Sequence, residues 1–350
     1  MTRKINFNMV SLLQFTFAVL IIAFHNQRIF PSDEWNFIQK NIISRLAVPF
    51  FIIASAFFVR WKTEQKKEFQ QKYTKKYIKT YLIWSLIYIP YGWMYFSSLG
   101  FSKALLPLGA VAALLYIGMC YHLWYLPAFL FGSFFINKFN KHVNLLMITL
   151  LAFSLFLVGS IETYQGYFVN TWLTTSYESY ARIFFTTRNG LFFTPVFVCL
   201  GYLLYDYRNH PFLTRHQARK ISLSFLILCF EAWFIFKNPG VDKNFLIGLI
   251  PTTFFLFNWS MRTRILFNRD LHQLKKLSVL YFFIHPMFIE GLRLTNLHQS
   301  IEPYSYAWVS LIITLIGTHL MALCLLFLQD KQEQILLRWR TLICNRNRLG

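Results

Sequence analysis

The sequence predicts an all-α membrane protein: a bundle of about ten transmembrane helices with both chain ends on the cytoplasmic side. Of its 350 residues 56% are hydrophobic, 20% are aromatic and only 14% are charged, a composition typical of integral membrane proteins. Apolar runs long enough to cross a bilayer recur from one end of the chain to the other, separated by short polar gaps.

The first predicted span runs from Met9 to His25 and carries no full charge. Gln14 and His25 are eleven positions apart, so they lie within about 20° of each other on one helix face. Two interpretations fit this pair. Either both side chains face the protein interior or a wet cavity, because a polar group in hydrocarbon is costly, or His25 sits at the headgroups and Gln14 bonds a neighbouring helix.

Basic loops set the predicted topology. The loop 60–79 holds eight Lys and Arg against two Glu, which indicates a cytoplasmic position. The apolar segment 105–119 is predicted to be a re-entrant or interfacial outer segment, because counting it as a span would move later basic loops outside. Cytoplasmic segments then hold 26 of the 35 Lys and Arg. The other spans are predicted near 42–59, 81–97, 123–137, 143–160, 190–206, 221–236, 245–259, 277–292 and 305–328.

We expect two regions: a transmembrane domain over 1–328 and a basic cytoplasmic tail over 329–350, amphipathic enough to lie on the inner leaflet. The net charge of +21 reports topology rather than nucleic-acid binding, and membrane lipids are the expected surroundings. The five cysteines are scattered without a CxxC pair, which argues against a metal site or a disulfide framework. The sequence does not define an oligomeric state.

Polar side chains gather near the outer ends of the predicted spans, where ionisable groups mark a pathway or a reaction centre. Structural roles without a reaction centre also stay open for these residues. Arg45 and Arg188 could extend to the lipid headgroups, and His122 could be an interfacial anchor. Glu231 is expected to pair with an arginine. The side chains at this depth are His25, Ser44, Arg45, His122, Trp124, Arg188, Asn189, Glu231, His285 and Glu290.

A second polar feature lies on the cytoplasmic side. Lys76 and Lys79 are three residues apart where the third span leaves the cytoplasm. This pair either anchors the helix under the positive-inside rule or holds the phosphates of a cytoplasmic donor. No glycine-rich phosphate loop accompanies it.

Five segments in order resemble the acyltransferase-3 family of bacterial integral membrane acyltransferases, which includes the membrane domains of VanT-type serine racemases. They are LLQFTFAVLIIAFH, SRLAVPFFIIASAFF, HLWYLPAFLFG, RNGLFFTPVFVCLG and YFFIHPMF, and the likeness covers about residues 5 to 325. The chain departs from the family at three points. Gln14 replaces the arginine of Arg-x10-His, Ala56 follows Ser55 where the family's FF-x-x-SG has glycine, and Lys76 and Lys79 stand for R-x-x-R.

The resemblance implies acyl transfer in the bacterial plasma membrane, from cytoplasmic acyl-CoA (acetyl-CoA above all) to a hydroxyl of a cell-envelope glycan or lipid-linked sugar. Acyl-CoA is then a co-substrate, and no bound cofactor or metal is expected. His25 is the expected base or acyl carrier, with Arg188 stabilising the oxyanion and His285 as orienting or relay residue. Lys76 and Lys79 would hold the CoA phosphates. The expected acceptor-binding residues are Gln14, Arg45, Ser55, His122, Trp124, Asn189 and Glu290.

A transporter or flippase for an amino acid, sugar or polysaccharide is the alternative, because the same outer polar cluster would serve it. Gln14 favours this alternative, since a neutral amide does not replace the charge of a guanidinium.

Overall fold

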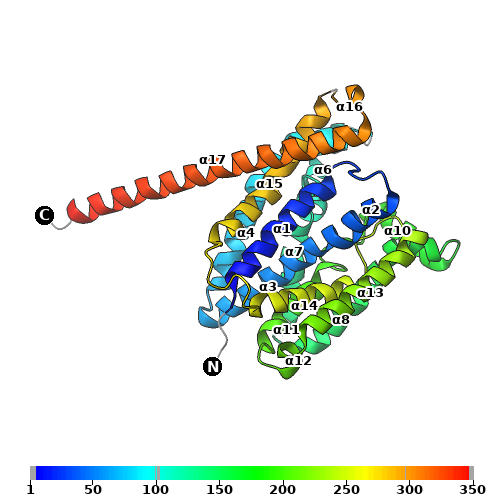
Figure 1. Cartoon of the computed structure of the whole chain (residues 1–350), viewed down its shortest axis with the longest axis horizontal. Helices are drawn as coiled ribbons and strands as arrows, with labels where there is room; N and C mark the ends of the chain where they lie inside the picture. The colour runs from blue at the N-terminus through cyan, green and yellow to red at the C-terminus, as the bar shows by residue number, and fades with distance from the viewer. Residues whose placement is uncertain (1–4, 99, 101–102, 296, 347–350) are drawn as a thin grey trace.

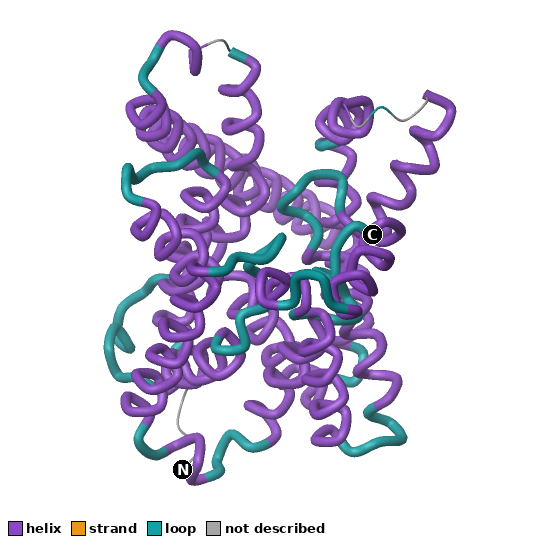
Figure 2. Tube along the Cα trace, turned by 90° about the vertical axis from the view of Figure 1, so that its right-hand side faces the viewer, coloured by secondary structure: helices purple, strands orange, loops and turns teal. Residues whose placement is uncertain are grey.

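The computed structural model describes residues 5–98, 100, 103–295 and 297–346, and every regular element in these ranges is a helix (Figure 2). Five stretches within them are long and apolar enough to cross a membrane: Phe7–His25, Asp33–Gln65, Leu145–Tyr167, His272–Leu294 and Pro303–Gln332. The predicted all-α membrane architecture is therefore confirmed. The number of ten spans and their orientation remain predictions.

The helices follow the apolar runs of the sequence. The third predicted span is divided between α4 and α5, which meet at Tyr88 just before Pro90. The longer helices are α1 (Phe7–His25), α3 (Ala47–Gln65), α4 (Phe69–Ile87), α7 (Tyr125–Phe139), α8 (Leu145–Gly159), α10 (Trp172–Phe184), α11 (Thr194–Asp206), α13 (Gln217–Lys237), α14 (Leu249–Arg262), α15 (His272–Leu294) and α17 (Pro303–Arg346). The shorter ones are α2 (Asp33–Phe37), α5 (Ile89–Ser98), α6 (Leu106–Ala112), α9 (Ile161–Tyr164), α12 (Pro211–Thr214) and α16 (Leu297–Ser300).

The centre of the bundle is formed by α1, α3, α11 and α15. Helix α1 packs mainly against α15 and also contacts α3, which in turn packs against α11 (Figure 1). The α3–α11 contact is close because Gly201 faces Ala56: a Cβ on Gly201 would lie 2.6 Å from that of Ala56. Small residues at such crossings let helix backbones approach. Gly201 thus makes room for the methyl group of Ala56.

The segment 105–119 forms a short, interrupted helix. Helix α6 continues into one π-helical stretch, Ala113–Ile117, and ends at Gly118 with φ 80°. Its apolar part, Pro107–Ile117, is about 16 Å long, roughly half of a hydrocarbon core. This length fits the predicted outer segment that does not span. Gly118 has no room for a Cβ, which would lie 2.8 Å from the backbone of Trp124, so the tight turn fixes the course of 119–124.

Helix α17 is 44 residues long, about 66 Å, and extends beyond the rest of the bundle (Figure 1). It continues through the predicted boundary at 328/329. The side chains from residue 335 onward and the whole of 347–350 lie outside the described part, so the predicted amphipathic tail stays a prediction.

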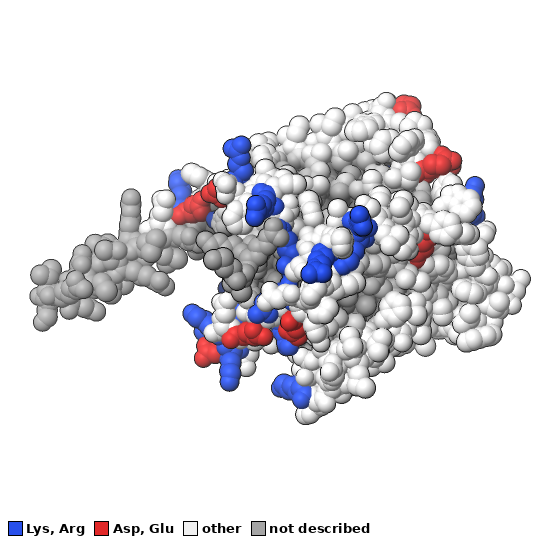
Figure 3. Space-filling view, turned by 60° about the horizontal axis from the view of Figure 1, so that its bottom comes forward, with Lys and Arg blue, Asp and Glu red and all other residues white. Residues whose placement is uncertain are grey.

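The surface divides into charged and uncharged regions. Figure 3 shows one face, where Lys and Arg gather toward the left and centre of the view while most other visible atoms are white. Large apolar side chains such as Leu86, Leu150, Leu226 and Leu320 are more than half exposed. Extended exposed apolar surface is what a lipid-facing bundle requires.

Candidate functional site

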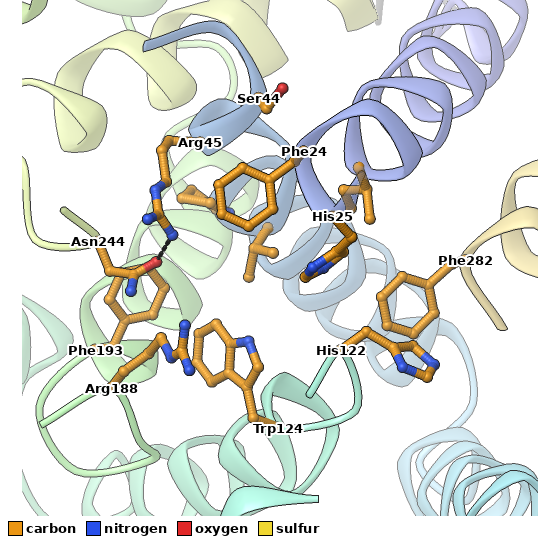
Figure 4. Close-up of a pocket in the computed structure, with 13 residues that line it drawn as sticks. Phe24, His25, Ser44, Arg45, His122, Trp124, Arg188, Phe193, Asn244 and Phe282 are labelled. Carbon is orange, nitrogen blue, oxygen red and sulfur yellow. Dashed lines mark hydrogen bonds between the residues drawn. The ribbon is translucent and has the colours of Figure 1, made fainter. Parts of the chain in front are cut away.

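A pocket lies where six parts of the chain meet. They are the end of α1, the turn Ser44–Leu46 with the start of α3, the segment 119–124, the loop before α11, the loop before α14, and α15. Its lining consists of Ile21, Phe24, His25, Ser44, Arg45, Val48, Pro49, His122, Trp124, Arg188, Phe193, Asn244 and Phe282 (Figure 4).

His25 is the last residue of α1 and its ring points into the pocket (Figure 4). The ring stacks on His285, with centroids 5.5 Å apart, and contacts Tyr121 at 4.6 Å. Of the two interpretations of the first span, the one in which the side chain faces the protein interior therefore applies to His25. Gln14 does not line the pocket; it lies three helical turns away, about 16 Å along the axis.

His285 is fully buried in α15, and its Nδ1 lies 2.9 Å from the carbonyl oxygen of Tyr281. A carbonyl oxygen only accepts hydrogen bonds, so Nδ1 carries the proton. The Nε2 atom is then an acceptor, and it is buried without a partner among the described residues. His122 packs against His285 at 5.3 Å between ring centroids, and both of its ring nitrogens are buried without partners in the same part of the chain.

Two guanidinium groups face the pocket from opposite elements and share one carboxylate. Arg45 Nη2 lies 3.3 Å from Asp242 Oδ1, and Arg188 Nη1 lies 3.6 Å from Asp242 Oδ2. Arg45 also donates to Asn244 Oδ1 (Figure 4), and Asn244 donates to Asp242. The loop between α13 and α14 thereby holds both arginines at one depth.

Aromatic rings support both guanidinium groups. Arg45 lies over Phe24 at 4.6 Å from the ring centroid, and Arg188 lies over Trp124 at 4.8 Å. Such cation–π contacts fix the plane of a guanidinium. The arginines are therefore oriented by contacts within the protein.

Asp242 is held in its charged form. Burial acts to raise the pKa of its carboxyl, but Arg45 and Arg188 outweigh this effect, together with the backbone N–H of Lys243 and the amide of Asn244. The pKa of Asp242 consequently lies below its usual value.

The other predicted residues lie outside this pocket. Ser55 is beside Tyr73. Asn189 is buried, donates to the hydroxyls of Tyr116 and Tyr180 and caps the turn at residues 191 and 192. Glu290 pairs with Arg293 at 2.8 Å. Lys76 and Lys79 are exposed on α4. The structure therefore brings together His25, Ser44, Arg45, His122, Trp124, Arg188 and His285, and it places Gln14, Ser55, Asn189, Glu290, Lys76 and Lys79 outside the pocket.

The expected ion pair of Glu231 is wrong. Its carboxylate accepts hydrogen bonds from Tyr164 and from the backbone N–H groups of Ile247 and Gly248, at 2.5 and 2.6 Å for the latter two. Glu231 thus supports the start of α14. Asp242 and Asn244, which sequence reasoning did not single out, take the role of pairing with arginine.

This arrangement supplies a ring nitrogen to move a proton and N–H donors to stabilise an anion. No group of three His, Cys, Asp or Glu placed to bind a metal occurs among the described residues. The fold and pocket define a helical membrane protein with a histidine–arginine site.

The chain belongs to the acyltransferase-3 family: the family model described as "Acyltransferase domain" matches residues 8–326. It is 29% identical to a serine/alanine racemase of Enterococcus gallinarum over 90% of this chain and 45% of that protein. It is also 29% identical to an amino-acid racemase of Enterococcus faecalis, over 75% of this chain and 37% of that protein. The chain thus spans less than half of these relatives. No solved structure matches it.

Proposed function

We propose that this protein transfers an acyl group, acetyl above all, from cytoplasmic acyl-CoA to a hydroxyl of a cell-envelope glycan or lipid-linked sugar in the bacterial plasma membrane. The observation that carries the proposal is that His25 shares one pocket with Arg45 and Arg188 while its ring stacks on that of His285. Family membership supports the reaction class.

The chemistry follows from this geometry. His25 takes the proton of the acceptor hydroxyl, whose oxygen attacks the thioester carbonyl; a C–O bond forms, the C–S bond breaks, and the proton passes to the departing CoA thiolate. If His25 carries the acyl group, its nitrogen displaces sulfur first and the hydroxyl oxygen then displaces nitrogen. Arg188 and Arg45 direct N–H donors at the developing oxyanion.

A second pocket suits the donor. It lies between α3, α4, α7 and α11, and its polar lining includes Tyr73, Thr74 and Asn137. Lys76 and Lys79 follow on the same helix, exposed and within two turns of Tyr73. Their charges would hold the phosphates of CoA while its thioester enters the bundle.

The test is mass analysis of ester groups on cell-wall and exopolysaccharide material from strains that express His25→Ala or the parent protein. We expect loss of the esters at unchanged protein level. His142→Ala, an exposed histidine outside the pocket, is the matched control and should keep them. Esters that persist in His25→Ala refute the enzyme proposal.

Transport of an amino acid is the second candidate. It is favoured by the names of the relatives, which are amino-acid racemases, and by Gln14 in place of the family arginine. It predicts that His25→Ala lowers uptake of labelled amino acid and leaves envelope esters unchanged.

A further inference from the structure

We infer that the acceptor is an anion: it carries a carboxylate or phosphate group that binds between Arg45 and Arg188, next to the hydroxyl presented to His25. This inference rests on the proposed function, because it names the substrate class of the same pocket. It is drawn from the charge balance and the unfilled hydrogen-bond donors of the site.

The pocket lining is positively charged. It includes two guanidinium groups and no carboxylate, and within the described residues Asp242 is the acid that pairs with both. Glu162 does not face the pocket: its carboxylate accepts from Thr186 Oγ1 at 2.8 Å and from the backbone N–H of Thr187 at 2.7 Å. Glu162 acts on Arg45 through its charge from behind the wall, so the guanidinium groups are the charged groups that line the pocket itself.

Nearby lysines do not reverse this balance. Lys40 donates to the carbonyl of Asn26 at 2.9 Å, and Lys243 donates to that of Gly240 at 3.1 Å. Both add positive charge around the pocket and neutralise none. A bound anion would restore neutrality.

Several N–H donors of the two guanidinium groups also lack a hydrogen-bond acceptor within the described residues. Each guanidinium carries five N–H donors. Arg45 uses donors for Asn244 and Asp242, whereas the side chain of Arg188 makes no hydrogen bond within the described residues beyond its 3.6 Å ion pair. The Nε atoms of both arginines are buried without a partner in the same part of the chain. Planar guanidinium groups with free N–H donors match the paired oxygens of a carboxylate or phosphate.

A neutral sugar would leave these donors poorly matched, at the cost that unsatisfied buried polar groups carry. A molecule that joins an anionic group to a hydroxyl satisfies both sides of the pocket: the anion at the arginines and the hydroxyl at His25. Uronic acids and polyol phosphates have this structure.

The test is calorimetric titration of the full-length protein in detergent with two matched pairs: glucuronate against glucose, and glycerol 3-phosphate against glycerol. At least one anion should bind ten times more tightly than its neutral partner, and the pair that responds identifies carboxylate or phosphate. Arg188→Gln should weaken that binding at least tenfold, and Arg188→Lys less. Arg60→Gln, which removes an arginine paired with Asp206 elsewhere, should leave it unchanged.

Equal binding of neutral and anionic partners, or anion binding that survives both Arg188 variants, overturns the inference. Arg188→Lys keeps the charge and serves if the glutamine variant does not fold. Acyl transfer from labelled acetyl-CoA, measured on the same preparation, separates the two proposals. Transfer to neutral acceptors alone upholds the enzyme and refutes the anionic acceptor. Arg188-dependent anion binding without transfer upholds the anion site between the arginines and refutes the enzyme proposal.

Discussion

Two arginine–aspartate contacts in this molecule differ in how completely they are satisfied. Arg60 and Asp206 form a one-to-one pair with two parallel hydrogen bonds, at 3.2 and 3.0 Å. At the pocket, by contrast, Arg45 and Arg188 share Asp242, and Arg188 approaches it only to 3.6 Å. The first contact joins α3 to α11 and is complete in itself. The second leaves charge and donors available, which is what a binding site requires.

The largest effect should come from removing the shared carboxylate. Asp242→Asn leaves two partly buried guanidinium groups, with side chains 13% and 28% exposed, without their counter-ion, and we expect it to lower the free energy of unfolding by about 2–4 kcal/mol. Asp206→Asn, at the more exposed pair, should cost less than about 1 kcal/mol. Thermal or denaturant unfolding in detergent measures both. Equal losses would show that the two contacts are alike.

Replacement of His285 tests the role of its ring nitrogen. His285→Phe keeps a flat ring against His25 but removes the Nε2 acceptor, so kcat for acyl transfer should fall at least about tenfold while KM for acyl-CoA changes little. A rise in KM at constant kcat would instead indicate a packing role. His142→Ala is the control for the loss of a histidine.

The pH dependence of stability separates the contacts further. Because the pKa of Asp242 is lowered on folding, its contribution is fully present above the ordinary Asp pKa of about 3.9 and is lost as pH falls through the lower folded value. The stability difference between the parent and Asp242→Asn should therefore be constant near neutral pH and shrink below about pH 4. If this stability difference instead shrinks between pH 8 and 6, a group other than Asp242 is responsible for it.

The smallest effect is expected at Gln14. Because it does not line the pocket, Gln14→Ala should change acyl transfer less than about threefold. A loss of tenfold or more would extend the site along α1, toward the position of the family arginine.

Much of the fold could be predicted because apolar length and loop charge are local properties of the sequence. The depth of His25, Arg45 and Arg188 followed from their places at the ends of predicted spans, and the structure places all three around one pocket. Which polar residues meet could not be predicted. Gln14 shares a helix face with His25 but lies outside the pocket, since sharing a face does not mean sharing a depth.

The missed residues show the same limit. Asp242 and Asn244 lie in the polar loop NPGVDKN between two spans, a composition that also suits a solvated turn. The helices around them fold this loop inward, so its burial depends on contacts between distant parts of the chain. The sequence did contain a signal for this pairing: Asp242 lies in a predicted outer loop, and Arg45 and Arg188 lie at the outer ends of predicted spans. Glu231, a carboxylate within a helix, was the more conspicuous candidate and pairs with Tyr164 and backbone N–H groups instead.

The most direct test of the account is acyl transfer by the purified full-length protein, with labelled acetyl-CoA as donor and extracted envelope glycan as acceptor. We predict that His25→Ala and Arg188→Gln each lower the rate at least about a hundredfold, while His142→Ala and Arg60→Gln stay within twofold of the parent. Full activity in His25→Ala would contradict the assignment of this pocket as the reaction centre.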